Sequence, residues 1–443
     1  MRVLVIGSGG REHALVKAMK TSTLVSRVFA WPGNAGIFLD AEPLPSEVRS
    51  HQELGLWAGA NKIALAVVGP ESELVRGVSD ILRANGVAVF GPSQQAAQLE
   101  ASKIFAKDFM FEFNVPTARA VVVESVAATL KAVADSGFAA PYVLKADGLA
   151  SGKGVFICSN IAELSEAARD IFEKHKLGDA GRRALLEEFQ PGREISVLVL
   201  TNGDDYEVLP YGRDHKRLLS GDRGPNTGGM GVIAPINIGE ALDVQIRKTV
   251  IDPTLRGLRD RKFLYRGVVF VGVMLTARGP QVLEYNVRFG DPETQAILPL
   301  LDGDWAQTLK AVAEGSVPKL KWRSDSTACI VVAAEGYPDN PVKGVPIPAL
   351  KPTAAPIPAA VPSQTATAAA SAAIQTTTAS TVQIIHAGTN LIDGQFVTAG
   401  GRVLNVVARA PNLDLALKQA YAQLNQIVWP GAQWRDDIGK IQD

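Results

Sequence analysis

The sequence predicts an α/β protein (α+β overall) that opens with a parallel-sheet domain. Three observations support this prediction. Residues 1–100 alternate short apolar runs with helical patterns, as in an open parallel sheet. The central part carries longer strand-like runs at residues 193–200, 268–276 and 281–289. A further strand at 402–408 and an amphipathic helix at about 413–427 predict a small C-terminal α+β domain.

The 443 residues are too many for one core and indicate several domains. We expect domains at 1–101, 102–320 and 326–443. The last contains a stretch at 349–381 that consists almost entirely of Ala, Pro, Thr and Ser. Such small side chains cannot build a core, so this stretch is predicted to be an insert.

The charges exclude several classes of function. The 45 basic and 45 acidic residues cancel, which gives no electrostatic case for binding nucleic acid or an anionic membrane. No run reaches the roughly 18 apolar residues of a membrane span, and the N-terminal run is too short for a signal peptide. The two cysteines, Cys158 and Cys329, lie in apolar runs and are expected to be reduced core residues. We expect a cytoplasmic protein with small-molecule substrates, present as a monomer or weak dimer.

The chain starts with a strand, a glycine loop at 7–10 and a helix. A dinucleotide fingerprint is disfavoured because Glu12 stands where a third glycine is needed, and no acidic residue ends the next strand at 26–30. Gly9, Gly10 and Arg11 can instead hold a monophosphate at the helix start. The alternative is a glycine turn required only for close helix packing.

Two later junctions repeat this design. Strand-like runs end in VVGPE at 67–71 and VFGPS at 89–93, each before a helical pattern. The carboxyl ends of parallel strands meet at one edge of a sheet, which is where open α/β folds bind ligands.

A glycine-rich hairpin is predicted between the strands at 142–146 and 155–158. Lys145 lies in the first strand, a helix beginning at Lys103 precedes it, and Lys153 is at the hairpin tip. The loop is not a Walker motif, because the glycine spacing is one residue short and a strand follows it. A flap that closes over phosphates explains the lysine and the glycines Gly148, Gly152 and Gly154. The alternative is an exposed hairpin with a solvated lysine.

Carboxylates and a polar loop follow. Glu187, Glu188 and Glu194 flank a Pro-Gly turn between two strands, and separately each is expected to be an ordinary surface residue. The loop at 214–231 is dense in glycine, and such a loop inside a compact domain is more often functional than idle.

The stretch at 282–295 carries the strongest signal for chemistry. Strand alternation predicts two faces, one with Val282, Glu284, Asn286 and Arg288 and the other with Leu283, Tyr285, Val287 and Phe289. Gly290 then ends the strand, Asp291 is predicted to cap a helix, and Pro292 suits its first position. A carboxylate, an amide oxygen, a guanidinium and free amides suit a metal-bound polyphosphate or carboxylate ligand. The alternative is an amphipathic edge strand with a solvated polar face.

These pieces occur together in a known family. The chain resembles the ATP-grasp ligases and, among them, the glycinamide ribonucleotide synthetases (phosphoribosylamine-glycine ligases). The motifs that carry the resemblance are VLVIGSGGREHAL, PGNAG, VVGPE, FGPS, QLEASK, LKADGLASGKGV, LLEEF, DHKR, GPNTGGMG, RFGDPETQ, HAGT and GGRVL.

The resemblance implies a central ATP-grasp domain of two lobes, with a flap lobe at about 118–189. It implies that Glu284 and Asn286 bind magnesium or manganese and that Lys103 and Lys145 contact the ATP phosphates. Glu187, Glu188 and Phe189 would form the adenine hinge, and Glu194 would contact the ribose. The reaction implied is that of a carbon–nitrogen ligase of purine biosynthesis: glycine, 5-phosphoribosylamine and ATP give glycinamide ribonucleotide, ADP and phosphate through a glycyl phosphate.

Lys145, Arg288 and Asp214 are the catalytic candidates. Arg288 suits the acyl phosphate or the glycine carboxylate, and Asp214 suits the glycine ammonium. Further residues are expected to bind substrate: Gly9, Gly10, Arg11, Lys216, Asn226, Thr227, Gly228, Gly290, Asp291 and Glu293.

Two features depart from the family pattern. Arg223 stands before GPNTGGMG where the family usually has a small residue, and the insert at 349–381 is unusually long. Three other functions remain as alternatives: a sibling ATP-grasp ligase or carboxylase, a non-enzymatic nucleotide-binding protein, and a dinucleotide oxidoreductase.

Overall fold

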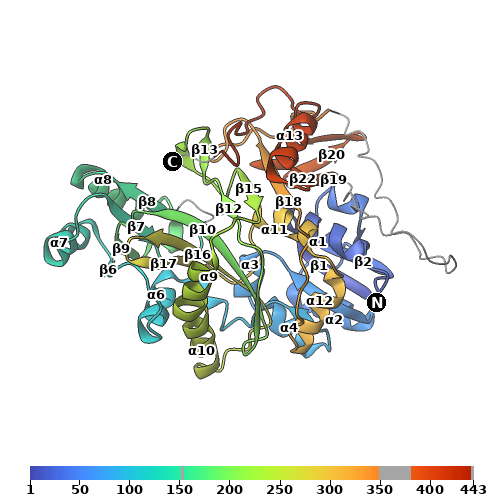
Figure 1. Cartoon of the computed structure of the whole chain (residues 1–443), viewed down its shortest axis with the longest axis horizontal. Helices are drawn as coiled ribbons and strands as arrows, with labels where there is room; N and C mark the ends of the chain where they lie inside the picture. Colours follow the sequence, from blue (N-terminus) through green and yellow to red (C-terminus); the bar gives the residue numbers. More distant parts are fainter. Residues whose placement is uncertain (151–153, 349–380, 441–443) are drawn as a thin grey trace, which may run out of the picture.

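The computed structural model describes residues 1–150, 154–348 and 381–440. Its N-terminal part is a parallel sheet in the order β3-β2-β1-β4-β5, with helices on both faces (Figure 1). Consecutive residues of β1 explain this layering: Leu4 and Ile6 enter one core and Val3 and Val5 the other, so the whole strand is apolar. The elements are β1 (Arg2–Gly7), α1 (Gly10–Lys20), β2 (Arg27–Pro32), η1 (Ile37–Leu39), β3 (Glu42–Pro43), α2 (His51–Ala60), β4 (Ile63–Val68), α3 (Glu71–Val75), α4 (Val78–Ala84) and β5 (Val89–Phe90).

A separate four-stranded sheet and its helices form the flap lobe at one end of the molecule (Figure 1). Its sheet has the order β6-β9-β7-β8, and α7 and α8 pack against it. α5 (Gln98–Ala101) and α6 (Lys103–Glu112) precede the lobe, whose elements are β6 (Ala120–Val123), α7 (Val126–Ser136), β7 (Tyr142–Ala146), β8 (Val155–Cys158), α8 (Ile161–Phe172), η2 (Gly178–Gly181) and β9 (Ala184–Glu188). The predicted strands on either side of the glycine hairpin are therefore present.

The central sheet is antiparallel, in the order β11-β10-β16-β17. It faces the flap lobe across α6. Its elements and the helices after it are β10 (Arg193–Thr201), β11 (Tyr206–Val208), α9 (Glu240–Ile246), η3 (Arg247–Ile251), α10 (Asp252–Asp260), β16 (Gly267–Thr276), β17 (Gly279–Asn286), α11 (Glu293–Ile297), η4 (Leu298–Leu300) and α12 (Trp305–Glu314).

The C-terminal sheet combines two segments of the chain. Its order is β12-β15-β18-β22-β19, so strands from the 213–234 region pair with strands that follow residue 326. The elements are β12 (Arg213–Asp214), β13 (Arg217–Leu219), β14 (Arg223–Asn226), β15 (Gly231–Ala234), β18 (Ser326–Ala333), β19 (Thr381–His386), β20 (Thr389–Ile392), β21 (Gln395–Thr398), β22 (Arg402–Ala410) and α13 (Leu413–Leu424). The predicted α/β fold class with three regions is confirmed, although this sheet crosses the sequence boundary expected near 320.

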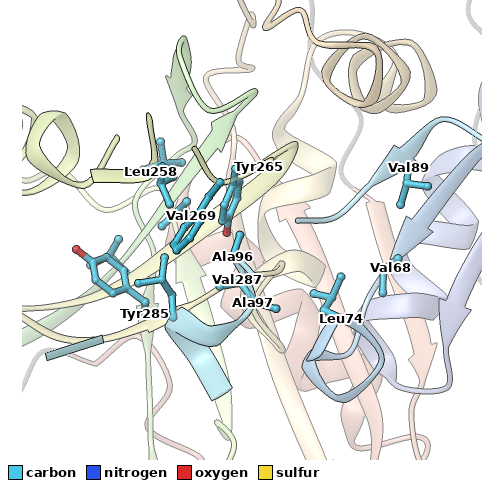
Figure 2. Close-up of a cluster of buried hydrophobic side chains, with 14 of the residues drawn as sticks. Val68, Leu74, Val89, Ala96, Ala97, Leu258, Tyr265, Val269, Tyr285 and Val287 are labelled. Atoms are coloured by element: carbon cyan, nitrogen blue, oxygen red, sulfur yellow. The ribbon is translucent and has the colours of Figure 1, made fainter. Parts of the chain in front are cut away.

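One hydrophobic core joins the N-terminal domain to the central sheet. Figure 2 shows Val68, Leu74 and Val89 on one side and Val269 and Tyr285 on the other, with Ala96, Ala97 and Val287 between them. Every one of these residues is at most 3% exposed. Burial of such a continuous apolar surface fixes the two regions against each other, and with them the walls of the space between.

A β-bulge corrects the predicted faces of β17. Val282 pairs with Val273 and Glu284 pairs with Gly272, so Leu283 is the extra residue of the bulged strand. As a result Val282 lies in the core with Tyr285 and Val287, while Leu283 turns toward the same space as Glu284. The prediction that Val282 shares a face with Glu284, and that Leu283 belongs to the core face, was wrong.

The junction after β17 also differs from the prediction. The strand ends at Asn286, not at Phe289, and α11 begins at Glu293 with Pro292 in the cap position. Asp291 does not cap this helix; its carboxylate accepts hydrogen bonds from the Arg11 amide (3.2 Å) and from Gln295 (2.8 Å). Asp291 therefore links the N-terminal domain to the polar end of β17.

Candidate active site

A cleft of about 1240 Å³ lies between the N-terminal domain, the flap lobe, the central sheet and the C-terminal region. Most of the residues singled out in the sequence line it: Gly9, Arg11, Lys103, Lys145, Gly154, Glu187, Glu188, Phe189, Glu194, Asp214, Lys216, Asn226, Thr227, Gly228, Glu284, Asn286, Arg288, Asp291 and Glu293. Gly10, Gly148 and Gly290 are absent from its lining, and Gly152 and Lys153 lie outside the described residues. Residues as far apart in sequence as Gly9 and Glu293 thus converge on one space.

Lys145 projects from β7 and is held by two oxygens. Its Nζ lies 2.8 Å from Glu187 Oε2 and donates to the Leu283 carbonyl at 3.1 Å. Glu187 is 3% exposed, so the expectation that it is a surface carboxylate was wrong. Burial opposes its ionisation, but Lys145 and Lys107 outweigh burial and lower the pKa of Glu187.

Lys103 begins α6 on the opposite side of the same space. Its Nζ donates to the Gly148 carbonyl at 3.2 Å, which connects the helix to the base of the glycine hairpin. Burial lowers the pKa of Lys103, opposed by Glu284. Lys103 and Lys145 therefore supply cationic charge to the same cleft.

The other carboxylates of the Pro-Gly turn differ in environment. Glu188 lies at the rim, where Arg119 (3.3 Å) and Arg278 (3.5 Å) pair with it. Burial raises the pKa of Glu194, whose nearest cation is Lys216 at 3.8 Å. Glu188 is thus the surface carboxylate that was expected, whereas Glu194 faces the cleft.

Glu284 and Asn286 form an oxygen donor pair on β17. Burial opposes ionisation of Glu284, yet Lys216, Lys145 and Lys103 lower its pKa, so it carries a negative charge. Asn286 Oδ1 accepts a hydrogen bond from Arg288 at 3.0 Å. A carboxylate and an amide oxygen are ligands that Mg²⁺ and Mn²⁺ accept, and Mg²⁺ commonly takes only one or two protein ligands beside substrate phosphates. The pair fits a divalent ion bound together with a nucleotide, which agrees with the finding that no group of three or more His, Cys, Asp or Glu positioned for a metal occurs in the part of the chain that the structure describes.

Arg288 joins β17 to the N-terminal domain. Its guanidinium contacts Glu100 at 2.7 Å and Glu71 at 3.2 Å in addition to Asn286. Burial raises the pKa of Glu100 to about 7, while both carboxylates raise the pKa of Arg288 against the effect of its own burial. The arginine expected to contact substrate is thus also the link between β17 and the N-terminal domain.

Asp214, on β12, and Lys216 line the cleft near Glu194. Lys216 Nζ is 3.2 Å from Asp214 Oδ2, and the other oxygen accepts the His215 amide at 2.7 Å. Burial raises the pKa of Asp214 to about 7, because the nearby Glu293 and Glu194 reinforce burial and only Lys216 opposes it. A cationic ligand at this point would favour the charged carboxylate.

The glycine loop at the N-terminus is filled by a carboxylate. Glu12 accepts the Gly9 amide at 2.6 Å and the Arg11 Nε at 2.5 Å, and Arg11 also donates to the Phe289 carbonyl at 2.9 Å. A side chain at Gly69 would lie 1.9 Å from Glu12, so this glycine is needed for close packing. Glu12 thus occupies donors that a monophosphate would use, and the phosphate role of Gly9, Gly10 and Arg11 stays a prediction.

The C-terminal region braces the loops on the substrate side. Arg402 donates to the carbonyls of Gly228 (2.5 Å) and Asp291 (2.7 Å), and the hydroxyl of Tyr337 accepts the Gly228 amide at 3.1 Å. Arg402 therefore holds together two loops that carry predicted substrate residues.

A second brace comes from residues 435–439. Arg435 donates to Asp222 at 2.6 Å, and Asp437 accepts the Gly221 amide at 2.8 Å, so this segment grips the β13–β14 hairpin. Both ring nitrogens of His215 contact backbone groups, those of Gly231 and Gly439. Arg223 is exposed on this hairpin, and the lining of the cleft does not include it.

Several cleft residues were assigned no role from the sequence: Glu71, Glu100, Lys107, Arg213, Tyr337, Arg402 and Arg435. Lys107 follows Lys103 by one helical turn, so the i, i+4 spacing was an available signal. Glu71 and Arg402 stand within motifs quoted above, but their partners lie far away in sequence.

Comparison with protein families agrees with this geometry. The chain matches the phosphoribosylglycinamide synthetase N domain over residues 1–100, its ATP-grasp domain over 101–294 and its C domain over 327–441. It is 40% identical to the phosphoribosylamine–glycine ligase of Mesorhizobium japonicum, covering 99% of this chain and 98% of that one.

The chain belongs to the phosphoribosylglycinamide synthetase family.

The chain is also similar to a longer protein and to solved structures. Identity is 41% to the trifunctional purine biosynthetic protein adenosine-3 of Gallus gallus, over 99% of this chain and 42% of that protein. The crystal structure of phosphoribosylamine–glycine ligase from Thermotoga maritima is similar with a TM-score of 0.80 at 32% identity, covering 99% and 100% of the two chains. The biotin carboxylase domain of Hydrogenobacter thermophilus 2-oxoglutarate carboxylase (TM-score 0.69, 16% identity, 98% and 91% covered) shares the fold. Members of this ATP-grasp family use ATP with a divalent metal ion. No helix among the described residues is long and apolar enough to cross a membrane.

Proposed function

We propose that the cleft joins glycine to 5-phosphoribosylamine at the expense of ATP, giving glycinamide ribonucleotide, ADP and phosphate. The observation that carries the proposal is that Lys103, Lys145 and Glu284 line one cleft together with Asp214 and Lys216. The lysines suit the phosphates of a nucleotide, and Asp214 suits the ammonium group of a small zwitterion. Family membership supports the choice of substrates.

The chemistry proceeds in two steps. Glycine carboxylate attacks the γ-phosphorus of ATP, which forms glycyl phosphate and releases ADP; the amine of 5-phosphoribosylamine then attacks the glycyl carbonyl carbon, and phosphate leaves as the amine loses a proton. Phosphoryl transfer requires placement and neutralisation of charge more than covalent help. Lys103 and Lys145 neutralise phosphate oxygens, Asp214 holds the glycine ammonium, and Arg288 faces the acyl end.

Glu284 and Asn286 would hold a magnesium or manganese ion, which when bound neutralises phosphate charge. We propose that either ion serves, because the pair contains only hard oxygen donors. Activity measured after chelation and readdition of each ion tests this point. A requirement for Zn²⁺ over both would contradict it.

We also propose roles for the residues at the edges of the site. Glu187, Glu188 and Phe189 border the adenine, Glu194 contacts the ribose, and the hairpin from Gly148 to Gly154 closes over the phosphates. The domains 1–101, 102–320 and 326–443, a cytoplasmic location and a monomer or weak dimer complete the proposal. Light scattering on the purified protein tests the oligomeric state.

The deciding experiment measures ADP release by purified protein with Mg²⁺. We expect release only when glycine and freshly generated 5-phosphoribosylamine are both present, with formation of glycinamide ribonucleotide in equal amount. Glu284→Gln serves as the matched variant and should abolish both signals. Release that needs another carboxylate in place of glycine would indicate a sibling ATP-grasp enzyme, and nucleotide binding without any turnover would indicate a non-enzymatic protein.

A further inference from the structure

Lys107 is a buried lysine of the cleft region that the proposed reaction does not use. It lies on α6 one turn after Lys103 and is 3% exposed. Its Nζ is 3.0 Å from Glu187 Oε1, 2.8 Å from Thr117 Oγ1 and 3.2 Å from the Ala118 carbonyl. These three acceptors match the three N–H groups of an ammonium, so Lys107 has no donor left for a ligand.

Lys145, in contrast to Lys107, has fewer acceptors than N–H groups. The structure gives it two acceptors, Glu187 Oε2 and the Leu283 carbonyl, and it lines the cleft. One of its N–H groups thus has no partner among the described residues. Glu187 therefore lies between two lysines and binds each with a different oxygen, but of the two only Lys145 has an N–H group left for a ligand.

The charge of this group explains why a second lysine is needed. One carboxylate between two lysines leaves a single net positive charge, whereas Lys145 and Glu187 alone would form a neutral pair. Interactions of this kind are strong in a buried site because little water screens them. Without Lys107, Glu187 would also keep an unpaired buried oxygen and would draw Lys145 toward itself.

We propose that Lys107 is a positioning residue for the nucleotide: by binding one oxygen of Glu187, it leaves the group with a net positive charge and keeps Lys145 aimed at the phosphates. The proposal rests on the proposed function, because it assumes that the cleft binds ATP. It assigns Lys107 no contact with the nucleotide. Its effect is expected in nucleotide affinity and not in the affinity for glycine or 5-phosphoribosylamine.

The test compares binding of ADP with Mg²⁺ to the unmodified protein and to Lys107→Met, by isothermal titration calorimetry. We expect affinity to fall about tenfold, which corresponds to about 1.4 kcal/mol. Lys131→Met is the matched control, because Lys131 is an exposed lysine on α7 that pairs with Asp135 on the surface. Thermal melting of each variant monitors the fold, and Lys107→Gln carries the same prediction if the methionine variant does not fold.

A double variant separates the charge effect from a structural one. Lys107→Met combined with Glu187→Gln restores one net positive charge at Lys145, so we expect it to bind ADP about threefold more tightly than Lys107→Met alone. A double variant no tighter than the single one, or a Lys107→Met affinity within twofold of the unmodified protein, would overturn the proposal. Steady-state kinetics add a second readout: KM for ATP should rise while KM for glycine stays constant, and a rise in both would also overturn it. Absence of ADP binding to the unmodified protein would instead count against the proposed function.

Discussion

Two parts of the cleft use charge in different ways: the part around Lys145, called the nucleotide end below, and the part around Arg288 and Arg402, called the substrate end. At the nucleotide end, Lys145 binds only one oxygen of Glu187, because Lys107 binds the other, and Lys145 keeps an N–H donor available for a ligand. At the substrate end, Arg288 and Arg402 are already bound to carboxylates and carbonyls of neighbouring loops. The nucleotide end thus has a cationic donor available for an anion. At the substrate end, the arginines instead connect loops from three regions of the protein. The comparison teaches that a charged residue in a cleft can serve the ligand or the walls, and that its partners decide which.

Lys145→Ala should produce the largest effect, because it removes the available donor at the nucleotide end. We expect kcat/KM for ATP to fall roughly 100- to 1000-fold, as when one preorganised donor is lost from a catalytic site. Steady-state kinetics measure this change, and Lys131→Ala is the control. A fall of less than tenfold would mean that the two ends do not differ as described.

Asp214→Asn should raise KM for glycine by roughly 10- to 100-fold, the usual loss of a hydrogen bond between charged groups. Because the pKa of Asp214 is raised to about 7, the unmodified enzyme should also lose affinity for glycine as pH falls below about 7. The asparagine variant should lack this dependence. KM for glycine measured from pH 5.5 to 8.5 tests both points, and an identical pH profile in the two proteins would contradict the role.

The same shift predicts the sign of a change in stability. A carboxyl whose pKa is higher in the folded state than in the unfolded state stabilises the fold at low pH and loses that contribution as pH rises through the folded value. The contribution of Asp214 should therefore decline between about pH 4 and pH 7. Urea unfolding of the unmodified protein and of Asp214→Asn over this range measures the difference.

Arg288→Lys should have a smaller effect on catalysis and a clear effect on stability. A lysine cannot satisfy Glu71, Glu100 and Asn286 together, so we expect the free energy of unfolding to fall by about 2 kcal/mol. Turnover should fall about tenfold. Denaturation and kinetics on the same variant show whether Arg288 stabilises the walls of the cleft. A loss of turnover with an unchanged free energy of unfolding would mean that Arg288 acts on the substrate alone.

Arg223→Ser should change least. This side chain is exposed and donates to the Ser220 carbonyl at 3.1 Å. We expect kinetic constants within about twofold of the unmodified enzyme, as is usual for surface substitutions. A larger change in KM for any substrate would show that this departure from the family pattern reaches the cleft.

The sequence predicted the nucleotide end better than the substrate end. Lys103, Lys145 and Glu284 each stand beside a recognisable strand, helix start or glycine loop, so local pattern was enough to find them. Glu100 is 188 residues from its partner Arg288, and Glu71 is 217 residues away. Contacts of that range depend on how the domains pack, which a period of two or 3.6 residues does not encode.

The faces of β17 were misjudged for a different reason. Alternation assigns sides correctly only while every residue is paired, and the bulge at Leu283 inserts one that is not. Glu284 and Asn286 were still placed together, because both lie after the bulge. The position of Val282, before it, was reversed.

The grip of residues 435–439 on the β13–β14 hairpin also sets an order of events during protein synthesis. A chain leaves the ribosome from its N-terminus, and domains generally fold as they emerge. Lys103, Lys145 and Glu284 are all made at least 150 residues before Arg435. The nucleotide end can therefore assemble on the ribosome. The β13–β14 hairpin gains its contacts with residues 435–439 only after nearly all of the C-terminal domain has been translated.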